Sequence, residues 1–140
     1  MPDDNPTPDE VWSLLTRVVM YSRDPWRRAA VERTGLSFSR IRVLRRLRKA
    51  GPMTVKEVAY AATMDAPAAT VAVNQLAELG YVVREVDPTN RRKKLVTITD
   101  AGRAVLAQAL ATPDPAPDSV TALSADDLRA LRDILSRIEH

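Results

Sequence analysis

A mainly helical fold with one small β-hairpin is predicted for this 140-residue chain by three features of its sequence. Apolar residues recur at helical spacing in several segments, and most of these segments start with a residue that caps helices. Only two short runs, residues 81–86 and 95–98, are rich in β-branched side chains. Aromatic residues make up only 4% of the chain, so aliphatic side chains must build the core, which favours helices.

The helices are expected in the following order. Thr7 and Glu10 have the spacing of a capping box, so the first helix begins there and its apolar stripe runs to Val19. Pro25 interrupts the pattern and either allows a second helix to start or kinks a single long one. Further helices are expected at residues 37–50, 55–62 and 66–79, the second of them opened by a capping box of Thr54 and Glu57.

The two β-rich runs flank a basic stretch and are expected to pair as a hairpin with Arg91–Lys94 at its tip. A helix that starts at Thr99 or Asp100 and runs through residue 106 follows. Prolines at 113, 115 and 117 cannot lie inside a helix, so residues 112–118 are expected to be a linker with an extended bias. Ser124 then opens a last helix, whose apolar stripe ends at Ile138.

Composition excludes several classes of function. The chain has no cysteine, and its single histidine is the final residue, His140, so thiolate metal sites and histidine-based catalytic triads cannot be built within one chain. We therefore predict no catalytic residues, no metal site and no cofactor, and we do not expect an enzyme. The acidic, proline-rich start is unlike a signal peptide, and no run of about 18 apolar residues exists, so no membrane span and a cytoplasmic location are expected.

Charge is distributed unevenly although the net charge is only +3. Residues 1–10 carry four acids and no base, and residues 113–140 carry six acids against three bases. In contrast, Arg40–Lys49 contains six bases and no acid, and Arg84–Lys94 contains five bases against two acids. A basic centre between acidic ends indicates an anionic partner, with nucleic acid as the first candidate.

The order of helix, short turn, helix and then hairpin is that of a winged helix-turn-helix. Residues 36–106 resemble the MarR (multiple antibiotic resistance regulator) family of bacterial transcription factors. The resemblance rests on "LSFSRIRVLRRLRKAGPMTVKEVA", "LAELGYVVREVDPTNRRKKLVTITDAG" and, near the end, "LSADDLRALRDILSRI". It implies a homodimeric repressor of transcription. Such a protein binds a pseudo-palindromic operator in double-stranded DNA and is released by a small ligand.

The resemblance also implies a domain organisation. Dimerisation helices would come from both chain termini: residues 1–34 with an acidic arm, and residues 101–140 with the linker. Residues 35–100 would form the DNA-binding domain. The linker cuts short the long helix that follows the wing in this family. The alternative for the two terminal helices is that they pack together within one chain.

The helix at 66–79 is expected to enter the major groove. Its inward stripe is Ala69, Ala72, Val73 and Leu76, and the outward residues are Pro67, Ala68, Thr70, Val71 and Asn74. Asn74 can pair with adenine, and the small side chains can meet thymine methyl groups. The helix contains no arginine or lysine, so guanine readout from it should be weak. A plain solvated helix face is the alternative.

The basic hairpin is expected to bind DNA as well. Arg91 or Arg92 can enter a narrow minor groove, while Lys93 and Lys94 lie near phosphates. Asp87 is expected to orient an arginine or the turn. The alternative is a charged tip that only prevents edge pairing. Ser37 and Arg40, at the start of the 37–50 helix, complete the predicted DNA-binding set.

Two further sites are less specific. The stripe Arg42, Arg45, Arg46 and Lys49 is expected to face phosphate or solvent, or the acidic terminus or last helix of a second subunit. A small-molecule pocket would involve Trp12, Tyr21, Trp26 and Phe38, although aromatics at helical spacing are more often core. A competing interpretation of the whole chain is a winged-helix module that binds protein or RNA and reads no bases.

Overall fold

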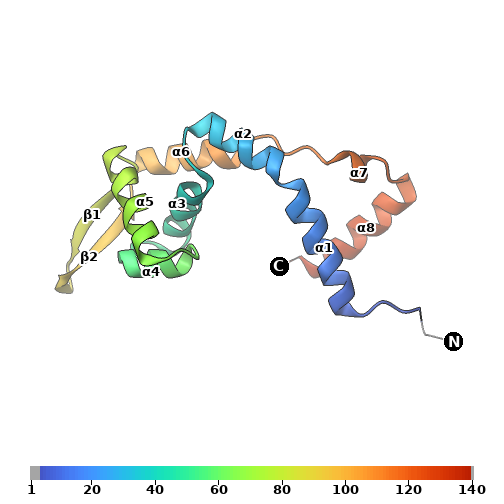
Figure 1. Cartoon of the computed structure of the whole chain (residues 1–140), viewed down its shortest axis with the longest axis horizontal. Helices are drawn as coiled ribbons and strands as arrows, with labels where there is room; N and C mark the ends of the chain where they lie inside the picture. Colours follow the sequence, from blue (N-terminus) through green and yellow to red (C-terminus); the bar gives the residue numbers. More distant parts are fainter. Residues whose placement is uncertain (1–3, 140) are drawn as a thin grey trace. The chain divides into compact units, whose positions relative to one another are not determined.

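The computed structural model describes residues 4–139 and divides the chain into two compact units. One unit spans Arg23–Thr112, and the other combines the residues up to Ser22 with those from Pro113 onward. Figure 1 labels the elements of both units. None of the helices in the described part of the chain is long and apolar enough to cross a membrane.

The larger unit contains the helix-turn-helix and the hairpin. Its elements are α2 (Asp24–Thr34), α3 (Phe38–Ala50), α4 (Val55–Ala61), α5 (Ala66–Glu78), β1 (Val82–Asp87), β2 (Asn90–Ile98) and α6 (Asp100–Leu110). Its core is aliphatic, as expected, and is centred on the fully buried Leu44, Leu47, Leu76 and Leu106. The unit extends beyond residues 35–100, because α2 and α6 both pack on the helices of the core.

Side-chain caps set most of the helix starts in this unit. Thr54 and Glu57 form the expected capping box at α4. Asp65 accepts a hydrogen bond from the backbone N–H of Ala68 at the start of α5, and Thr99 accepts one from Gly102 at the start of α6. These bonds satisfy backbone donors that a helix leaves unpaired in its first turn. The start of α5 is thereby fixed.

The hairpin is longer and more irregular than predicted. Strand β2 begins at Asn90, so Arg91–Lys94 lie within the strand, and the turn itself is Pro88-Thr89. The expectation of a basic tip between strands 81–86 and 95–98 was therefore wrong. Val86 pairs with Lys94, but its neighbour Asp87 pairs with Asn90, which leaves three basic residues in a bulge. The strand continues because backbone pairing at its outer end does not require β-branched side chains.

The base of the hairpin is joined to the core by a third short segment. The N–H of Met53 donates to the carbonyl of Val96 at 3.1 Å, and the N–H of Val96 donates to the carbonyl of Met53. Val82, Val96 and Ile98 are buried on the same side. This bridge anchors the inner half of the wing, whereas no residue of its outer half is buried.

Gly102 allows α6 to approach the start of the hairpin closely. A Cβ atom at this position would collide with the backbone carbonyl oxygen of Tyr81 and lie 2.9 Å from Cγ1 of Ile98. The backbone of Tyr81 is itself held, because its carbonyl accepts from the N–H of Thr99 at 3.1 Å. Only glycine fits between these groups.

The smaller unit contains α1 (Pro8–Ser22), α7 (Asp118–Thr121) and α8 (Ala125–Ile138). The capping box of Thr7 and Glu10 is formed, and Ser124 caps α8. Helix α1 ends before Pro25 and a separate α2 begins at Asp24, so the chain restarts a helix there and does not continue a kinked one. Residues 113–117 lack regular structure, and the short α7 after them was not predicted.

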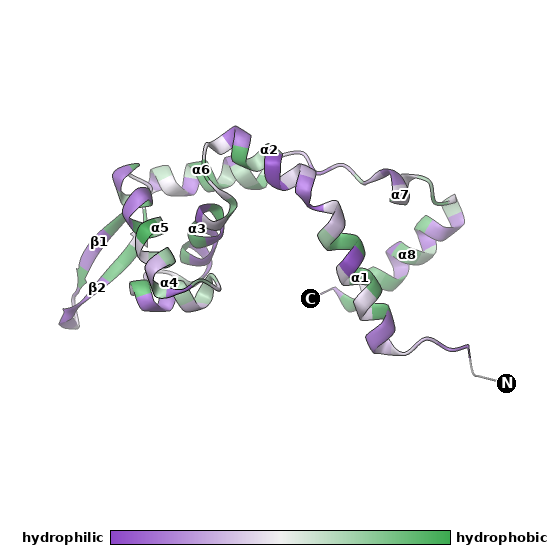
Figure 2. Ribbon diagram, viewed as in Figure 1, coloured by the Kyte–Doolittle hydropathy of each residue, from purple (hydrophilic) through white to green (hydrophobic). Residues whose placement is uncertain are grey.

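Neither α1 nor α8 has a buried residue. Figure 2 shows apolar residues along both helices. The exposed fractions of these side chains are large, for example 53% for Leu14 and 52% for Ile138. Two amphipathic helices with uncovered apolar stripes are typical of segments that are completed by another chain.

Candidate nucleic-acid interface

Helix α5 has the two faces that its sequence predicts. The stripe Ala69, Ala72, Val73 and Leu76 is buried to at least 98%. The predicted outward residues are all exposed: Pro67, Ala68, Thr70, Val71 and Asn74. The hydroxyl of Thr70 donates to the carbonyl of Ala66 at 3.0 Å, so only its acceptor capacity faces outward. The predicted outward residues of α5 are therefore small or medium-sized, uncharged and accessible to solvent.

Asn74 is engaged by a residue that the sequence pattern did not single out. The Nη2 group of Arg84, on β1, donates to Oδ1 of Asn74. Bidentate pairing of Asn74 with adenine would require this same Oδ1 as an acceptor, so the arginine competes with that contact. Helical periodicity gives no sign of a bond between a helix and a strand, and the isolated cation of the 81–86 strand was the only available signal.

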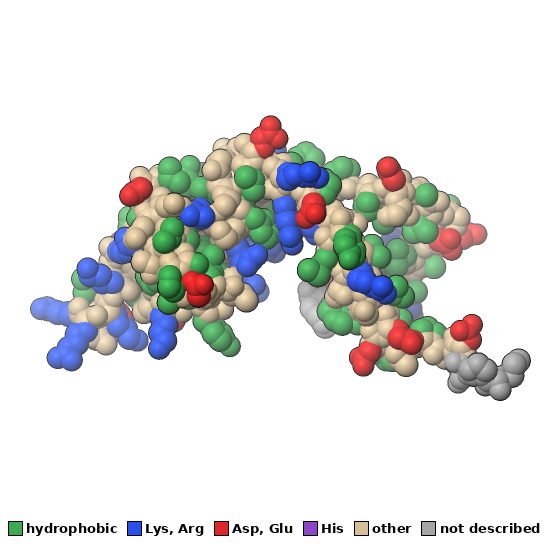
Figure 3. Space-filling view, viewed as in Figure 1, with side chains coloured by type: hydrophobic (Ala, Val, Ile, Leu, Met, Phe, Trp, Pro, Cys, Tyr) green, Lys and Arg blue, Asp and Glu red, His purple; other side chains and the backbone are tan. Residues whose placement is uncertain are grey.

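The cations of the wing lie together, and none of them forms an ion pair among the described residues. Figure 3 shows lysine and arginine side chains gathered at the far end of the hairpin. All four predicted wing cations, Arg91, Arg92, Lys93 and Lys94, are exposed, and within residues 4–139 none of them forms an ion pair. Such a cluster attracts a polyanion, and three of its members lie in the bulge.

Asp87 shapes the turn of the wing. Its Oδ1 accepts hydrogen bonds from the backbone N–H of Thr89 at 2.9 Å and from the hydroxyl of Thr89 at 2.8 Å. These bonds, and to a smaller extent the charge of Lys93, hold the pKa of Asp87 below its ordinary value of 3.8. The geometry is that of an Asx turn, so of the two predicted roles Asp87 orients the turn.

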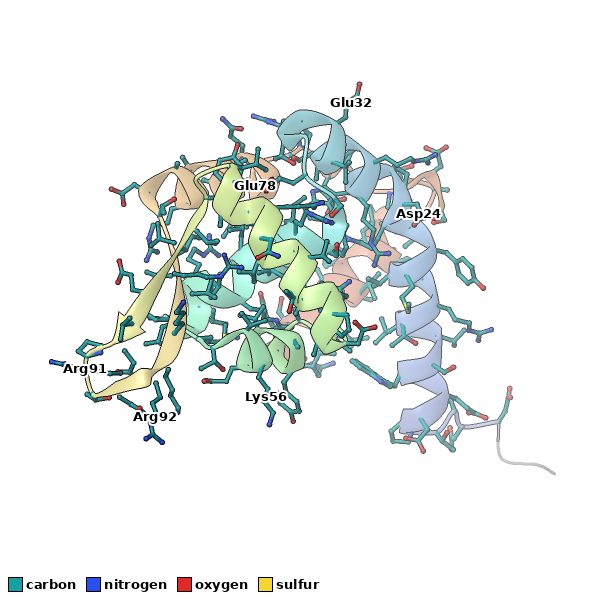
Figure 4. The ribbon with its side chains drawn as sticks, turned by 60° about the vertical axis from the view of Figure 1, so that its left-hand side comes forward. Asp24, Glu32, Lys56, Glu78, Arg91 and Arg92 are labelled. Carbon is teal, nitrogen blue, oxygen red and sulfur yellow. The ribbon has the colours of Figure 1, made fainter. Side chains whose placement is uncertain are left out.

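Six charged side chains of the larger unit are labelled in Figure 4. In Figure 4, Arg91, Arg92 and Lys56 lie along the lower side, while Asp24, Glu32 and Glu78 lie along the upper side. Helix α4 adds Tyr60, whose side chain is 91% exposed one turn after Lys56. Lys56 and Tyr60 were not predicted as site residues. Their spacing of four residues on a short helix could have indicated them.

The start of α3 has no side-chain cap. Ser37 occupies the N-cap position, but its hydroxyl makes no capping bond. Instead its Oγ accepts from Nη1 of Arg40 at 2.7 Å and lies 3.0 Å from Oγ of Ser39. Ser37 and Arg40 therefore form one polar cluster, which is half-buried.

The basic stripe of α3 is only partly free. Arg42 is half-buried, because it donates to the carbonyl of Ala62 at the end of α4 at 3.1 Å and stacks over the ring of Phe38. Arg42 and the other cations of this helix from Arg45 onward line a groove of about 470 Å³ with an aromatic wall. The groove is bounded by Trp26, Phe38, Ile41, Arg42, Arg45, Arg46, Arg48, Lys49 and Leu110.

The four aromatic residues predicted to form a pocket fall into two groups. Trp26 and Phe38 meet edge to face in the larger unit, with ring centroids 6.1 Å apart, and both line the groove. Trp12 and Tyr21 belong to the other unit and are 66% and 82% exposed. Among residues 4–139, aspartate and glutamate side chains form no group of three that could hold a metal ion.

Comparison with known proteins identifies this arrangement. Residues 34–93 match the MarR family. The chain can be superimposed on a mutant MarR from E. coli with a TM-score of 0.74 at 23% identity, covering 96% of this chain and 98% of that one. The winged-helix part of the chain, residues 34–93, matches the MarR family, and the fold is that of the solved MarR structure.

Two other proteins extend the MarR-family comparison. The "Uncharacterized HTH-type transcriptional regulator YcgE" of Bacillus subtilis is 31% identical over 90 residues, which are 64% of this chain and 55% of that protein. This match therefore spans about half the length of the curated relative. A mutant MepR from S. aureus, solved bound to an oligodeoxyribonucleotide, has a TM-score of 0.66 at 18% identity, with coverage of 91% and 94%.

The MarR-family match lies within the larger unit. It includes α3, α4, α5, β1 and the first residues of β2, and it ends at Lys93, inside the bulge. The helices α1 and α8 lie outside the matched residues. The part of the chain with the clearest family match thus includes the basic residues of the wing up to Lys93.

Proposed function

We propose that the protein is a DNA-binding transcriptional regulator that acts as a homodimeric repressor on a pseudo-palindromic operator. The observation that carries this proposal is the outer face of α5, which is small and accessible, next to a wing whose four basic residues lack ion pairs in the described chain. A helix of this kind fits the major groove, and a cationic hairpin fits the adjacent phosphates and minor groove. DNA as the partner also implies the cytoplasmic location expected from the sequence.

The charge distribution supports the orientation of this contact. Lys56, Arg91 and Arg92 lie on one side of the larger unit, opposite Asp24, Glu32 and Glu78. The basic side chains on this side would attract a duplex. Ser37 and Arg40 lie half-buried at the start of α3 and are proposed as further phosphate contacts.

The uncovered helices support the dimeric part of the proposal. α1 and α8 have apolar stripes that nothing in the described chain buries. A second copy would cover them with the same stripes, as a twofold interface requires. For a symmetric dimer that reads successive major grooves, the two α5 helices would lie about 34 Å apart.

Release by a small ligand would use the groove beside α3. Its volume of about 470 Å³ is within the range of small-molecule sites, and its five basic residues favour an anionic ligand. Trp26 lines the groove, and in a Trp12→Phe variant it is the remaining tryptophan. Binding of an aromatic carboxylate in the groove should therefore change the fluorescence of this variant. The same compound should weaken DNA binding, and Arg45→Ala should reduce both effects.

The alternative is a winged-helix module that binds protein or RNA without reading bases. The absence of arginine and lysine from α5 favours it. A gel shift with the promoter of the protein's own gene, in the presence of unrelated competitor DNA, separates the two. Retention of the promoter complex under competitor supports the regulator, whereas equal loss to any competitor, or no shift, supports the module.

A further inference from the structure

One bond between helix and hairpin gives α5 a cation that its own sequence lacks. Arg84 faces α5 because β1 alternates: Val82, two residues earlier, is buried, and the cross-strand partner of Arg84 is the buried Val96. The Nη2 group of Arg84 donates to Oδ1 of Asn74, on the exposed face of α5. Both side chains are accessible to solvent.

The charge of Arg84 is not neutralised by this bond. Asn74 is an uncharged amide, and no carboxylate in residues 4–139 forms an ion pair with Arg84. A guanidinium group carries five N–H donors, of which Asn74 takes one. The remaining donors are available to an acceptor that approaches the outer face of α5.

The bond uses one lone pair of Asn74 Oδ1 and directs this oxygen toward the guanidinium group, so the paired side chains offer mainly donors to an approaching base. Once Oδ1 is engaged, Asn74 presents mainly its NH₂ group, and an arginine never accepts. In the major groove, guanine presents two acceptors, N7 and O6, whereas adenine presents one acceptor and one donor. A surface composed of donors therefore matches guanine and opposes the amino group of adenine.

We infer that Arg84, held in place by Asn74, reads a guanine in the major groove and is the specificity-determining residue of this interface. The inference rests on the proposed binding of duplex DNA. It reverses the expectation from α5 alone, because the guanine contact comes from β1. Asn74 acts as the positioning residue, which restricts a long side chain that would otherwise sample many rotamers.

The test is a selection of bound duplexes from a library with randomised positions, carried out with the full chain and with three variants. Arg84→Ala removes the guanidinium group. Arg84→Lys keeps the charge but loses the planar fork that grips two acceptors. Arg103→Ala is the matched control, because it removes one exposed cation from α6 that is not among the predicted DNA-binding residues.

The unaltered chain should prefer guanine about tenfold at one position of each half-site. Arg84→Ala should abolish this preference and leave the other positions unchanged, and Arg103→Ala should retain it. Arg84→Lys should bind with near-normal affinity but reduced discrimination, which a merely structural role of Arg84 would not produce. Thermal unfolding of each variant verifies that the fold is kept.

Two results would overturn the inference, and they can be distinguished. If Arg84→Ala selects the same sequences as the unaltered chain, DNA binding stands and Arg84 does not read a base. If the unaltered chain selects no sequence, the proposed function fails together with the inference.

Discussion

The indole Nε1 of Trp26 donates a hydrogen bond to the backbone carbonyl of Thr112, 3.3 Å away, and so joins the first turn of α2 to the residues just after α6. Trp26 is buried, Thr112 is only 5% exposed, and the two residues lie near the two ends of the larger unit. This bond therefore joins the first and last parts of the larger unit in the sequence, just before the prolines at 113, 115 and 117.

Replacement of Trp26 by phenylalanine should destabilise the larger unit. The variant keeps an aromatic ring beside Phe38 but leaves the Thr112 carbonyl without its donor. A buried polar group that loses its partner costs about 1–3 kcal/mol. Urea unfolding followed by circular dichroism would measure the change. An unaltered free energy of unfolding would mean that water replaces the indole at no cost.

Arg92→Ala should weaken binding of duplex DNA without changing the melting temperature. Arg92 is exposed, and within residues 4–139 it forms no ion pair, so the fold does not depend on its guanidinium group. Fluorescence anisotropy with a labelled duplex would measure the affinity. Arg103→Ala, which removes a cation from α6, is the control and should bind normally.

The salt dependence of the same measurement tests electrostatic docking. If about six phosphates per dimer are neutralised, the log–log slope of affinity against salt should be about −5. Arg92→Ala should make this slope shallower by about one for each phosphate that the arginine neutralises. A slope close to zero, or normal binding by Arg92→Ala alongside loss of binding by Asn74→Ala, would contradict the assignment of the wing.

Leu135→Asp should convert the dimer into a monomer. Leu135 belongs to the apolar stripe of α8 and is 39% exposed in the single chain, so a dimer partner would have to bury the new carboxylate at high cost. Sedimentation velocity would measure the change. Ser136→Asp, which adds the same charge at an exposed polar position, is the control. If the stripes instead pack within one chain, the unaltered protein is monomeric and Leu135→Asp lowers its melting temperature.

Gly102→Ala should destabilise the protein although it lies in a helix. Alanine is a better helix former by about 1 kcal/mol, but its Cβ would collide with the carbonyl of Tyr81. Forced displacement of packed groups costs about 1–3 kcal/mol, so the collision outweighs the propensity. Thermal unfolding checks this, with Gln108→Ala, at an exposed position of α6, as the control. A rise in melting temperature would show that the hairpin can move away.

The turn of the wing should loosen only at a pH low enough to protonate Asp87, which is below its ordinary pKa of 3.8. The pKa of Asp87 is depressed in the folded chain because the ionised carboxylate accepts the bonds from Thr89. Its contribution is therefore present above the ordinary value of 3.8 and is lost as the pH falls through the lower folded value. A carboxyl ¹³C NMR titration should give a midpoint below 3.8. Thr89→Ala should raise that midpoint, and an unshifted midpoint in the unaltered chain would refute the turn.

Local patterns predicted much of the fold. The spacing of Ala69, Ala72, Val73 and Leu76 was sufficient to identify the buried face of α5, because helical periodicity depends on the backbone alone. The capping box of Thr54 and Glu57 was equally local. The exposed residues of α5 and the wing followed from the same patterns, whereas their contacts with DNA stay predictions.

Contacts between elements could not be predicted in this way. Arg42 shares the spacing of Arg45 and Lys49, yet it bonds the carbonyl of Ala62 because α4 packs beside it. Arg84 reaches Asn74 only because the hairpin folds back along α5. The bulge opposite Val86 depends on how the turn closes, and neither charge nor β-propensity encodes that register.

The backbone bridge between Met53 and Val96 divides the hairpin into an inner half that is held to the core and an outer half that is not. Amide hydrogens at these two residues are held by reciprocal bonds next to buried side chains and should exchange slowly with deuterium, whereas those from Val86 outward should exchange within the dead time. We therefore expect the inner half of the hairpin to keep a fixed direction relative to α5. We expect its outer half, with the basic residues, to bend and so to fit DNA grooves of different widths.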